Sequence, residues 1–143
     1  MASHAEDFSV NTIIGPNSEL KGDLNTDGFT RVDGNLHGNL TVAGRVVIGE
    51  AARMRGNISG TVVTIGGVVR GNVLASERLT ILSGALILGD IITRRIQADE
   101  GCLVHGRVRV CRAPEAWEAA VSEYADAQGV KSALSRFNRH DTL

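Results

Sequence analysis

The sequence predicts an all-β fold: a parallel β-helix (a β-solenoid), triangular in cross-section, with about six windings of about 17 residues each. Three observations predict it. A glycine-containing triplet recurs at a nearly constant spacing, aliphatic residues recur in pairs at the same spacing, and aromatic residues make up only 3% of the chain. A core without aromatic rings must be thin, and Ile, Val, Leu and Ala fill such a core well on pleated strands.

The recurring triplet is glycine, then Asp or Asn, then an aliphatic residue. Apart from an extra copy at Gly34, its glycines are Gly22, Gly38, Gly56, Gly71 and Gly89, with a variant at Gly106-Arg107-Val108. Neighbouring copies lie 15 to 18 residues apart. Gly, Asn and Asp turn the chain tightly because they tolerate positive φ, so each triplet marks a corner of the winding.

Between the corners, aliphatic residues form columns that repeat with the same period. One core column is Ile14, Val32, Ile48, Ile65, Ile81 and Ala98, and a second is Leu24, Leu40, Ile58, Val73, Ile91 and Val108. Each column has a partner column two residues away, and this is the periodicity of strand residues that point to one side. Three such pairs per winding predict three short strands around a shared core.

The same columns define the domain boundaries. We expect residues 1–9 to form an N-terminal tail, residues 10–111 to form the solenoid, and residues 112–143 to form a C-terminal tail. A parallel crossover favours the right hand, although solenoids of both hands exist. With about 4.8 Å between windings, the rod is about 30 Å long.

Both ends of the predicted rod are apolar and carry no polar capping repeat. The predicted polymerisation interface comprises Val10, Thr12, Ile13 and Ile14 at one end and Leu103, Val104, Val108 and Val110 at the other. Open strand edges are templates for further pairing, and an end-to-end contact that does not close gives filaments. The alternative is that flanking segments fold over the ends.

The C-terminal tail predicts a short amphipathic helix of about 14 residues. Pro114 suits its first turn and Gly129 suits its end, while Trp117, Val121 and Tyr124 share one face. A second small basic helix is predicted within residues 131–143. The first helix either packs on the rod or binds a partner. The second option underlies the alternative function, a non-polymerising solenoid adaptor that binds protein partners through this helix.

No catalytic, cofactor-binding or metal-binding site is predicted, and the chain is not expected to be an enzyme. His37 and His105 occupy equivalent positions about four windings apart, too far to share a metal ion. Gly66-Gly67 lacks the Lys-Ser/Thr of a phosphate-binding loop, so no nucleotide is expected.

Charge and targeting signals restrict the partners further. The net charge is −1, and no aromatic residues interleave with the basic ones, so no nucleic acid is expected. Five arginines near the corners, Arg53, Arg55, Arg70, Arg94 and Arg95, are expected to form a solvated face with nearby acids such as Glu50, Asp90 and Asp99. The alternative is a basic strip along one side of the rod. The two cysteines do not suggest a disulfide framework, and no signal peptide or membrane-spanning segment is recognisable, so a cytoplasmic location is expected.

Several phrases of the sequence resemble bactofilins, bacterial cytoskeletal proteins that form polymers. They are Lys21-Gly22-Asp23-Leu24, the stretch from Val32 to Leu40, and Val46-Val47-Ile48-Gly49-Glu50. The resemblance implies a right-handed triangular β-helix that stacks end to end into filaments without a nucleotide. It also implies support of cell shape, cell-wall synthesis or polar organisation in a bacterium.

The resemblance further implies a residue at the contact between subunits. Family members often place a Phe in the terminal winding, and here that position holds Leu103, which is also apolar. The main partner is then a second copy of the chain. Cell-wall or membrane-associated protein partners, a position at the inner face of the cell membrane, and contact of the short N-terminal tail with the membrane stay open at this stage.

Overall fold

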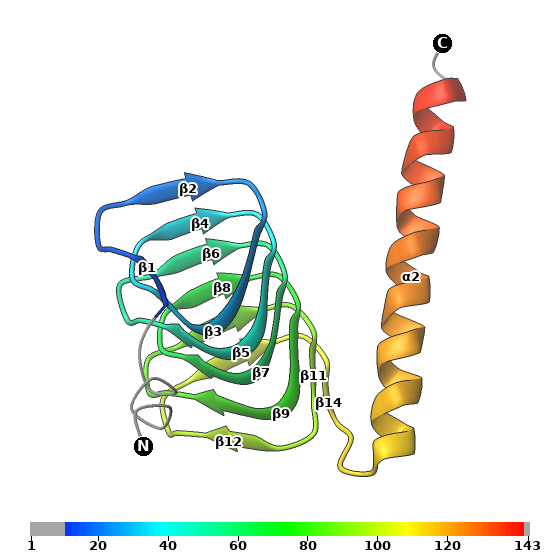
Figure 1. Cartoon of the computed structure of the whole chain (residues 1–143). Coiled ribbons are helices and arrows are strands. Elements are labelled where there is room, and N and C mark those ends of the chain that lie inside the picture. Colours follow the sequence, from blue (N-terminus) through cyan, green and yellow to red (C-terminus); the bar gives the residue numbers. More distant parts are fainter. Residues whose placement is uncertain (1–10, 142–143) are drawn as a thin grey trace.

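Every strand pairs in parallel with the equivalent strand of the neighbouring winding, and the result is a β-solenoid of about six turns with a helix beside it (Figure 1). The structure is a computed structural model that describes the backbone of residues 11–141 and the side chains of residues 11–127. The N-terminal tail of residues 1–9 and Val10 therefore lie outside the described residues. The predicted parallel solenoid is confirmed.

The strands form two sheets. The eight-stranded sheet contains β1 (Thr12–Ile14), β3 (Leu24–Val32), β5 (Leu40–Ile48), β7 (Ile58–Ile65), β9 (Val73–Ile81), β11 (Ile91–Thr93), β12 (Ile96–Ala98) and β14 (Val108–Val110). The six-stranded sheet contains β2 (Glu19–Lys21), β4 (Asn35–His37), β6 (Arg53–Arg55), β8 (Val68–Arg70), β10 (Leu86–Leu88) and β13 (Leu103–His105).

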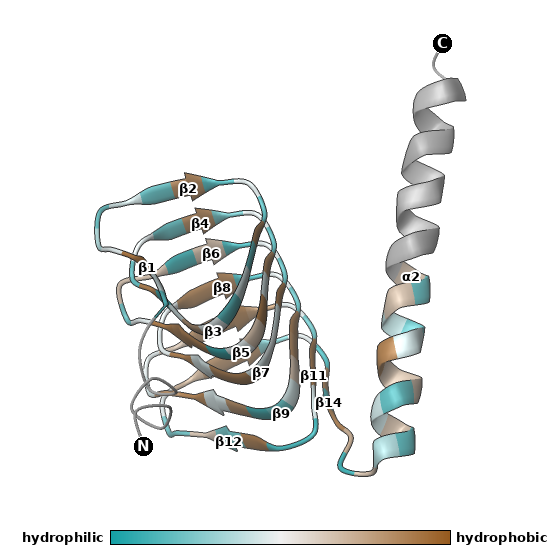
Figure 2. Cartoon of the chain, in the orientation of Figure 1, coloured by the Kyte–Doolittle hydropathy of each residue, from teal (hydrophilic) through white to brown (hydrophobic). Residues whose placement is uncertain are grey.

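The strand registers stack equivalent side chains directly above one another. Ile48 pairs with Val32 on one side and with Ile65 on the other, and Ile65 pairs in turn with Ile81. All four side chains are 0% exposed. The other core column has the same arrangement: Leu40, Ile58, Val73 and Ile91 are buried between the two sheets, whereas its end members Leu24 and Val108 are half-buried and exposed. Hydrophobic stretches recur in every winding in Figure 2.

Two of the three predicted strands of a winding are joined into one in most of the rod. The four strands β3, β5, β7 and β9 run across two sides of the rod, with lengths of eight or nine residues. Gly28 and Gly44 pair at this corner, and register shifts follow in the next two windings. The prediction of three separate strands was wrong here because a glycine bends a strand without ending its ladder. Among the described windings, only β11 and β12 are separated, by Arg94 and Arg95.

The triplet glycines allow the windings to approach each other closely. Gly71 has a φ of +155°, and a Cβ atom on it would lie 2.0 Å from the carbonyl oxygen of Gly56. The following Asp or Asn side chain then continues the stack: Asn57 Oδ1 accepts a hydrogen bond from the Asn72 backbone N–H at 2.9 Å, and Asn72 Oδ1 accepts one from Asp90. The triplet therefore both turns the chain at a corner and holds neighbouring windings together.

Replacing one triplet glycine should destabilise the whole rod. In Gly71→Ala, the new Cβ meets a backbone oxygen that cannot move without displacing the neighbouring winding. We expect the free energy of unfolding to fall by about 2–3 kcal/mol, from backbone strain and the close contact. Gly15→Ala is the matched control, because its Cβ has no neighbour closer than 3.9 Å. Urea denaturation followed by circular dichroism compares the two, and equal midpoints would contradict the role of Gly71.

The C-terminal segment is one helix, α2 (Pro114–Asp141), and the prediction of a short helix ending at Gly129 followed by a second helix was wrong. A glycine inside a helix costs only about 1 kcal/mol, and the good helix formers around Gly129 outweigh it. The helix begins beside β14 and lies along the side of the rod (Figure 1). It therefore does not cover the end of the rod where it begins.

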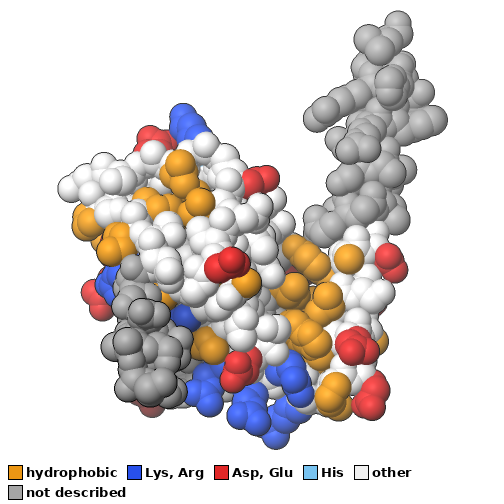
Figure 3. Space-filling model, in the orientation of Figure 1, with side chains coloured by type: hydrophobic (Ala, Val, Ile, Leu, Met, Phe, Trp, Pro, Cys, Tyr) orange, Lys and Arg blue, Asp and Glu red, His pale blue; other side chains and the backbone are white. Residues whose placement is uncertain are grey.

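The first half of α2 packs on the outer face of the eight-stranded sheet. Ala120 of the helix is 0% exposed and Ile92 of β11 is 4% exposed, although Ile92 faces outward from the rod. Two polar contacts flank this apolar contact: Arg109 donates to Glu123 at 3.0 Å, and Asn72 Nδ2 donates to Tyr124 Oη at 3.4 Å. Figure 3 shows the hydrophobic side chains gathered between the rod and the helix.

Candidate assembly surfaces at the two ends

The large hydrophobic side chains that are exposed in the described part of the chain lie in the first and last windings. They are Ile13 and Leu20 in the first winding and Ile96, Leu103, Val108 and Val110 in the last. Their exposed fractions run from 36% for Ile96 to 67% for Leu103. Leu20, Ile96, Val108 and Val110 belong to inward columns, and the equivalent side chains in the middle windings are buried because another winding covers each side. Ile13 and Leu103 instead face outward from their strands. Exposed apolar surface is thus concentrated at the two ends of the rod.

At the N-terminal end, the predicted interface residues differ in exposure. Ile13 is 61% exposed, Thr12 is half-buried and Ile14 is 8% exposed, while Val10 lies outside the described residues. Sequence reasoning missed Leu20 on β2, which is 37% exposed. The signal was present in the sequence, because Leu20 is the first member of a column that continues with Leu36.

At the C-terminal end, the predicted residues lie on two sides of the last winding. Val108 and Val110 on β14 are each 42% exposed, Leu103 on β13 points outward and Val104 is half-buried. The residue missed here is Ile96 on β12, which closes the column that contains Leu79. The structure brings Val104, Val108, Val110 and Ile96 to the rim of one open layer, and it places the N-terminal set at the opposite end of the rod.

Within the described residues, each terminal strand of the rod pairs on one side only. Within the rod, the N–H groups of Gly89 and Ile91 donate to the carbonyl oxygens of His105 and Arg107 in the next winding, at 3.0 and 2.8 Å. The equivalent donors in the last winding belong to Gly106 and Val108, and no further winding follows in the described part of the chain. Each end therefore presents a strand edge together with its apolar layer.

The side-chain ladder of the triplets stops one step before the C-terminal end. Asp90 Oδ1 accepts a hydrogen bond from the Arg107 backbone N–H at 3.0 Å. Arg107 stands where the earlier triplets carry Asp or Asn, and a guanidinium group has no acceptor for a further backbone N–H. The last winding therefore differs chemically from the windings inside the rod.

Other candidate sites are dispersed. The register places His37 and His105 four windings apart, since Arg55, Arg70 and Leu88 lie between them. No group of three His, Cys, Asp or Glu side chains within the described residues is close enough to hold a metal ion. Cys102 and Cys111 are free thiols. No helix in the described part of the chain is both long and apolar enough to cross a membrane.

The five arginines near the corners lie on two sides of the rod. Arg53, Arg55 and Arg70 lie on β6 and β8 of the six-stranded sheet, whereas Arg94 and Arg95 lie at the corner between β11 and β12. The alternative of a single basic strip was therefore wrong, because spacing along the sequence does not reveal which corner of the winding a residue occupies.

Comparison with known proteins agrees with this geometry. A family model described as Bactofilin, polymer-forming cytoskeletal, matches residues 12–109. Bactofilin BacP of Myxococcus xanthus (strain DK1622) is 29% identical over 98 residues, which cover 68% of this chain and 41% of BacP. Bactofilin BacO of the same organism is 26% identical over 99 residues, which cover 69% of this chain and 79% of BacO. No solved structure matches the chain.

Proposed function

This chain belongs to the bactofilin family, and we propose that it assembles end to end into filaments without a nucleotide and acts as a cytoskeletal scaffold. The family description, polymer-forming cytoskeletal, implies self-association. The contact surfaces in this proposal are the two terminal layers. One contains Val10, Thr12, Ile13, Ile14 and Leu20, and the other contains Ile96, Leu103, Val104, Val108 and Val110.

The observation that carries the proposal is the confinement of exposed large hydrophobic side chains to the first and last windings of the described rod. A second rod stacked on either end would bury these side chains and pair the free strand edges. Apolar burial contributes about 25 cal/mol per Å². Edges that are neither capped nor blocked by charge tend to pair in this way. Because contacts at two opposite ends of a rod do not close on themselves, the assembly has no fixed number of copies.

Electron microscopy of the purified chain tests assembly directly. We expect filaments in buffer that contains neither ATP nor GTP, and we expect the same filaments after treatment with apyrase. The amount that sediments at high speed should rise steeply above a threshold concentration. A chain that stays monomeric by light scattering at high concentration, in both low and physiological salt, would contradict the proposal.

We propose further that residues 10–111 are the polymerising unit and that residues 1–9 and 112–143 are accessory tails. The family model matches residues 12–109, which supports this division without assigning the tails. The cellular role in this proposal is support of cell shape, cell-wall synthesis or polar organisation. The proposed location is the cytoplasm, at the inner face of the cell membrane, together with wall- or membrane-associated protein partners.

The alternative function as an adaptor depends on a free helical face. The described face of α2 is already in contact with the rod, since Ala120 is buried and Trp117, Val121 and Tyr124 are half-buried. Between these two functions, the scaffold role is therefore the one that the geometry supports best.

A further inference from the structure

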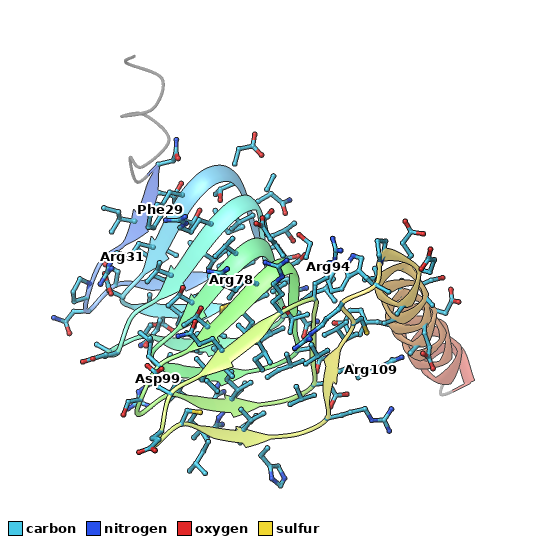
Figure 4. All side chains as sticks on the ribbon, turned by 90° about the horizontal axis from the view of Figure 1, so that it is seen from below. Phe29, Arg31, Arg78, Arg94, Asp99 and Arg109 are labelled. Atoms are coloured by element: carbon cyan, nitrogen blue, oxygen red, sulfur yellow. The ribbon has the colours of Figure 1, made fainter. Side chains whose placement is uncertain are left out.

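A groove lies near the C-terminal end of the rod, at the corner where β11 is separated from β12. Its volume is about 860 Å³, and it is open to solvent. Four arginines line it, Arg78, Arg94, Arg95 and Arg112, and we call it the arginine groove. Ile96 and Val110 supply apolar wall. Figure 4 labels Arg78 and Arg94 at this corner, and Figure 3 shows basic side chains along the lower edge of the rod.

The positive charge of the groove is not neutralised within the described part of the chain. The ion pairs found there involve Lys21, Arg31, His37 and Arg109, and none involves an arginine of the groove. Arg94 instead donates to the Arg112 carbonyl oxygen at 3.1 Å, which fixes the Arg94 side chain without removing its charge. Glu77 is the single carboxylate in the lining. The net charge of the lining is therefore about +3, which attracts an acidic ligand.

The first ten residues of the chain have the complementary composition. Glu6 and Asp7 are adjacent and are followed by Phe8, and the segment contains no Lys or Arg. The planar guanidinium group of an arginine binds one carboxylate through two hydrogen bonds, so each of these two carboxylates can pair with one arginine. An aromatic ring beside them suits the apolar wall.

The first described residue, Asn11, lies on the same corner of the rod as the arginine groove. Asn11 bonds to Phe29, since its N–H donates to the Phe29 carbonyl and its Oδ1 accepts from the Phe29 N–H. Along the rod the same corner position is then taken by Arg45, Val62, Arg78 and Arg95.

The distance along this corner matches the length of the segment. Arg78 lies four windings from Asn11, about 19 Å at about 4.8 Å per winding. Five extended residues from Asn11 to Glu6 span about 17 Å, and the two long side chains cover the remainder.

We propose that the arginine groove is a docking site for an acidic segment and that its occupant is the N-terminal tail of the same chain, residues 1–9. Glu6 and Asp7 pair with Arg78 and Arg95, and the segment runs along the corner from the first winding toward the last. This contact does not depend on filament formation, so it holds below the assembly threshold. It places the N-terminus beside the layer that contains Ile96 and Val110.

Cleavage by a glutamate-specific protease tests the contact in the full chain. Mass spectrometry follows the loss of residues 1–6, which reports cutting after Glu6, and a free peptide of residues 1–10 gives the rate for an accessible site. The wild-type chain should be cut at least about fivefold more slowly than the peptide, as expected for exposed ion pairs that together contribute about 1 kcal/mol. The double variant Arg78→Ala, Arg95→Ala should be cut at the rate of the peptide.

Two controls separate the groove from other causes. Arg53→Ala, Arg55→Ala removes two exposed arginines from the six-stranded sheet and should leave the wild-type rate unchanged. Raising the salt concentration from about 0.05 to about 0.5 M shortens the screening length. The wild-type chain should then be cut faster relative to the peptide. This second comparison needs no variant.

Three results would overturn the proposal. Wild-type cutting at the rate of the peptide means that the segment is free and the groove is open to an external anion or partner. Protection that persists in the groove variant and in high salt means that another surface holds the segment. Protection that disappears on dilution below the assembly threshold means that the occupied groove belongs to a neighbouring copy.

Discussion

Ile65→Asp is expected to abolish folding of the rod. Ile65 is 0% exposed and lies in the middle of a column, between Ile48 and Ile81. The change removes about 1.5–3 kcal/mol of apolar burial. It also places a carboxylate where the neighbours in the column are aliphatic, at a cost of several kcal/mol more. Because single domains are stable by only about 5–15 kcal/mol, a change of this size unfolds most of the population.

The effect should not stay local. Each winding buries its apolar face only against its neighbours, so loss of one middle winding leaves two short stacks with four exposed ends. Far-ultraviolet circular dichroism of the soluble fraction measures the outcome, and we expect no β signal or no soluble protein. Ile65→Val is the conservative control and should cost about 0.5–1.5 kcal/mol while it keeps the fold. A folded Ile65→Asp chain that still assembles would refute the column arrangement.

The repeat could be predicted from the sequence alone because its physical causes are local and recur in every winding. Glycines such as Gly71 must stand where a side chain would collide with the neighbouring backbone, so they mark the period directly. Ile48 and Ile65 must both be aliphatic because each faces the same thin core. When six windings impose the same requirement, the columns can be aligned without a structure, and the strand registers follow that alignment.

The features that sequence reasoning missed depend on context beyond one winding. A glycine such as Gly44 reads as the end of a strand, but its partner Gly28 bends with it and the ladder continues. Gly129 reads as the end of a helix, yet the residues on both sides of it favour helix strongly enough to continue. The arginine groove was missed because Arg78 and Arg112 lie far apart in the chain and meet only at the corner.

The candidate assembly surfaces were partly predictable for a related reason. The last layer was found from Val108 and Val110 because the repeat visibly stops after them. Leu20 and Ile96 look like ordinary members of their columns, and only their position in a terminal winding exposes them. Membership in a column is thus readable from the sequence, whereas exposure requires knowing which winding has no neighbour.

A charged C-terminal layer is expected to abolish filaments while the fold is retained. In Val108→Glu, Val110→Glu, both new side chains stand at positions that are 42% exposed in the single chain, so they remain hydrated there. The arginine groove beside Val110 can pair with the carboxylate at position 110, but it does not reach Val108. Stacking a second rod on this layer would therefore strip water from an unpaired carboxylate at position 108, which costs several kcal/mol. Since each 1.4 kcal/mol is a factor of ten, the threshold concentration for assembly should rise at least about 100-fold.

High-speed sedimentation and electron microscopy measure this loss, and circular dichroism shows whether the fold persists. Thr41→Glu, Ala43→Glu is the matched control, because it adds the same two charges to exposed positions of β5 away from either end. It should leave the threshold within about threefold of the wild-type value, as usual for exposed surface charges. Filaments of unchanged threshold in the Val108, Val110 variant would mean that the C-terminal layer takes no part in assembly.

The size of the species left by the blocked variant also distinguishes the two ways of stacking. If unlike ends meet in the filament, every contact uses one C-terminal layer, so a blocked layer leaves monomers. If like ends meet, every second contact joins two N-terminal layers, which still contain Ile13 and Leu20, so a blocked C-terminal layer leaves dimers. Light scattering separates a 15.1 kDa monomer from a dimer. Adding Leu20→Glu should convert such dimers to monomers, because it places a carboxylate in the remaining apolar layer.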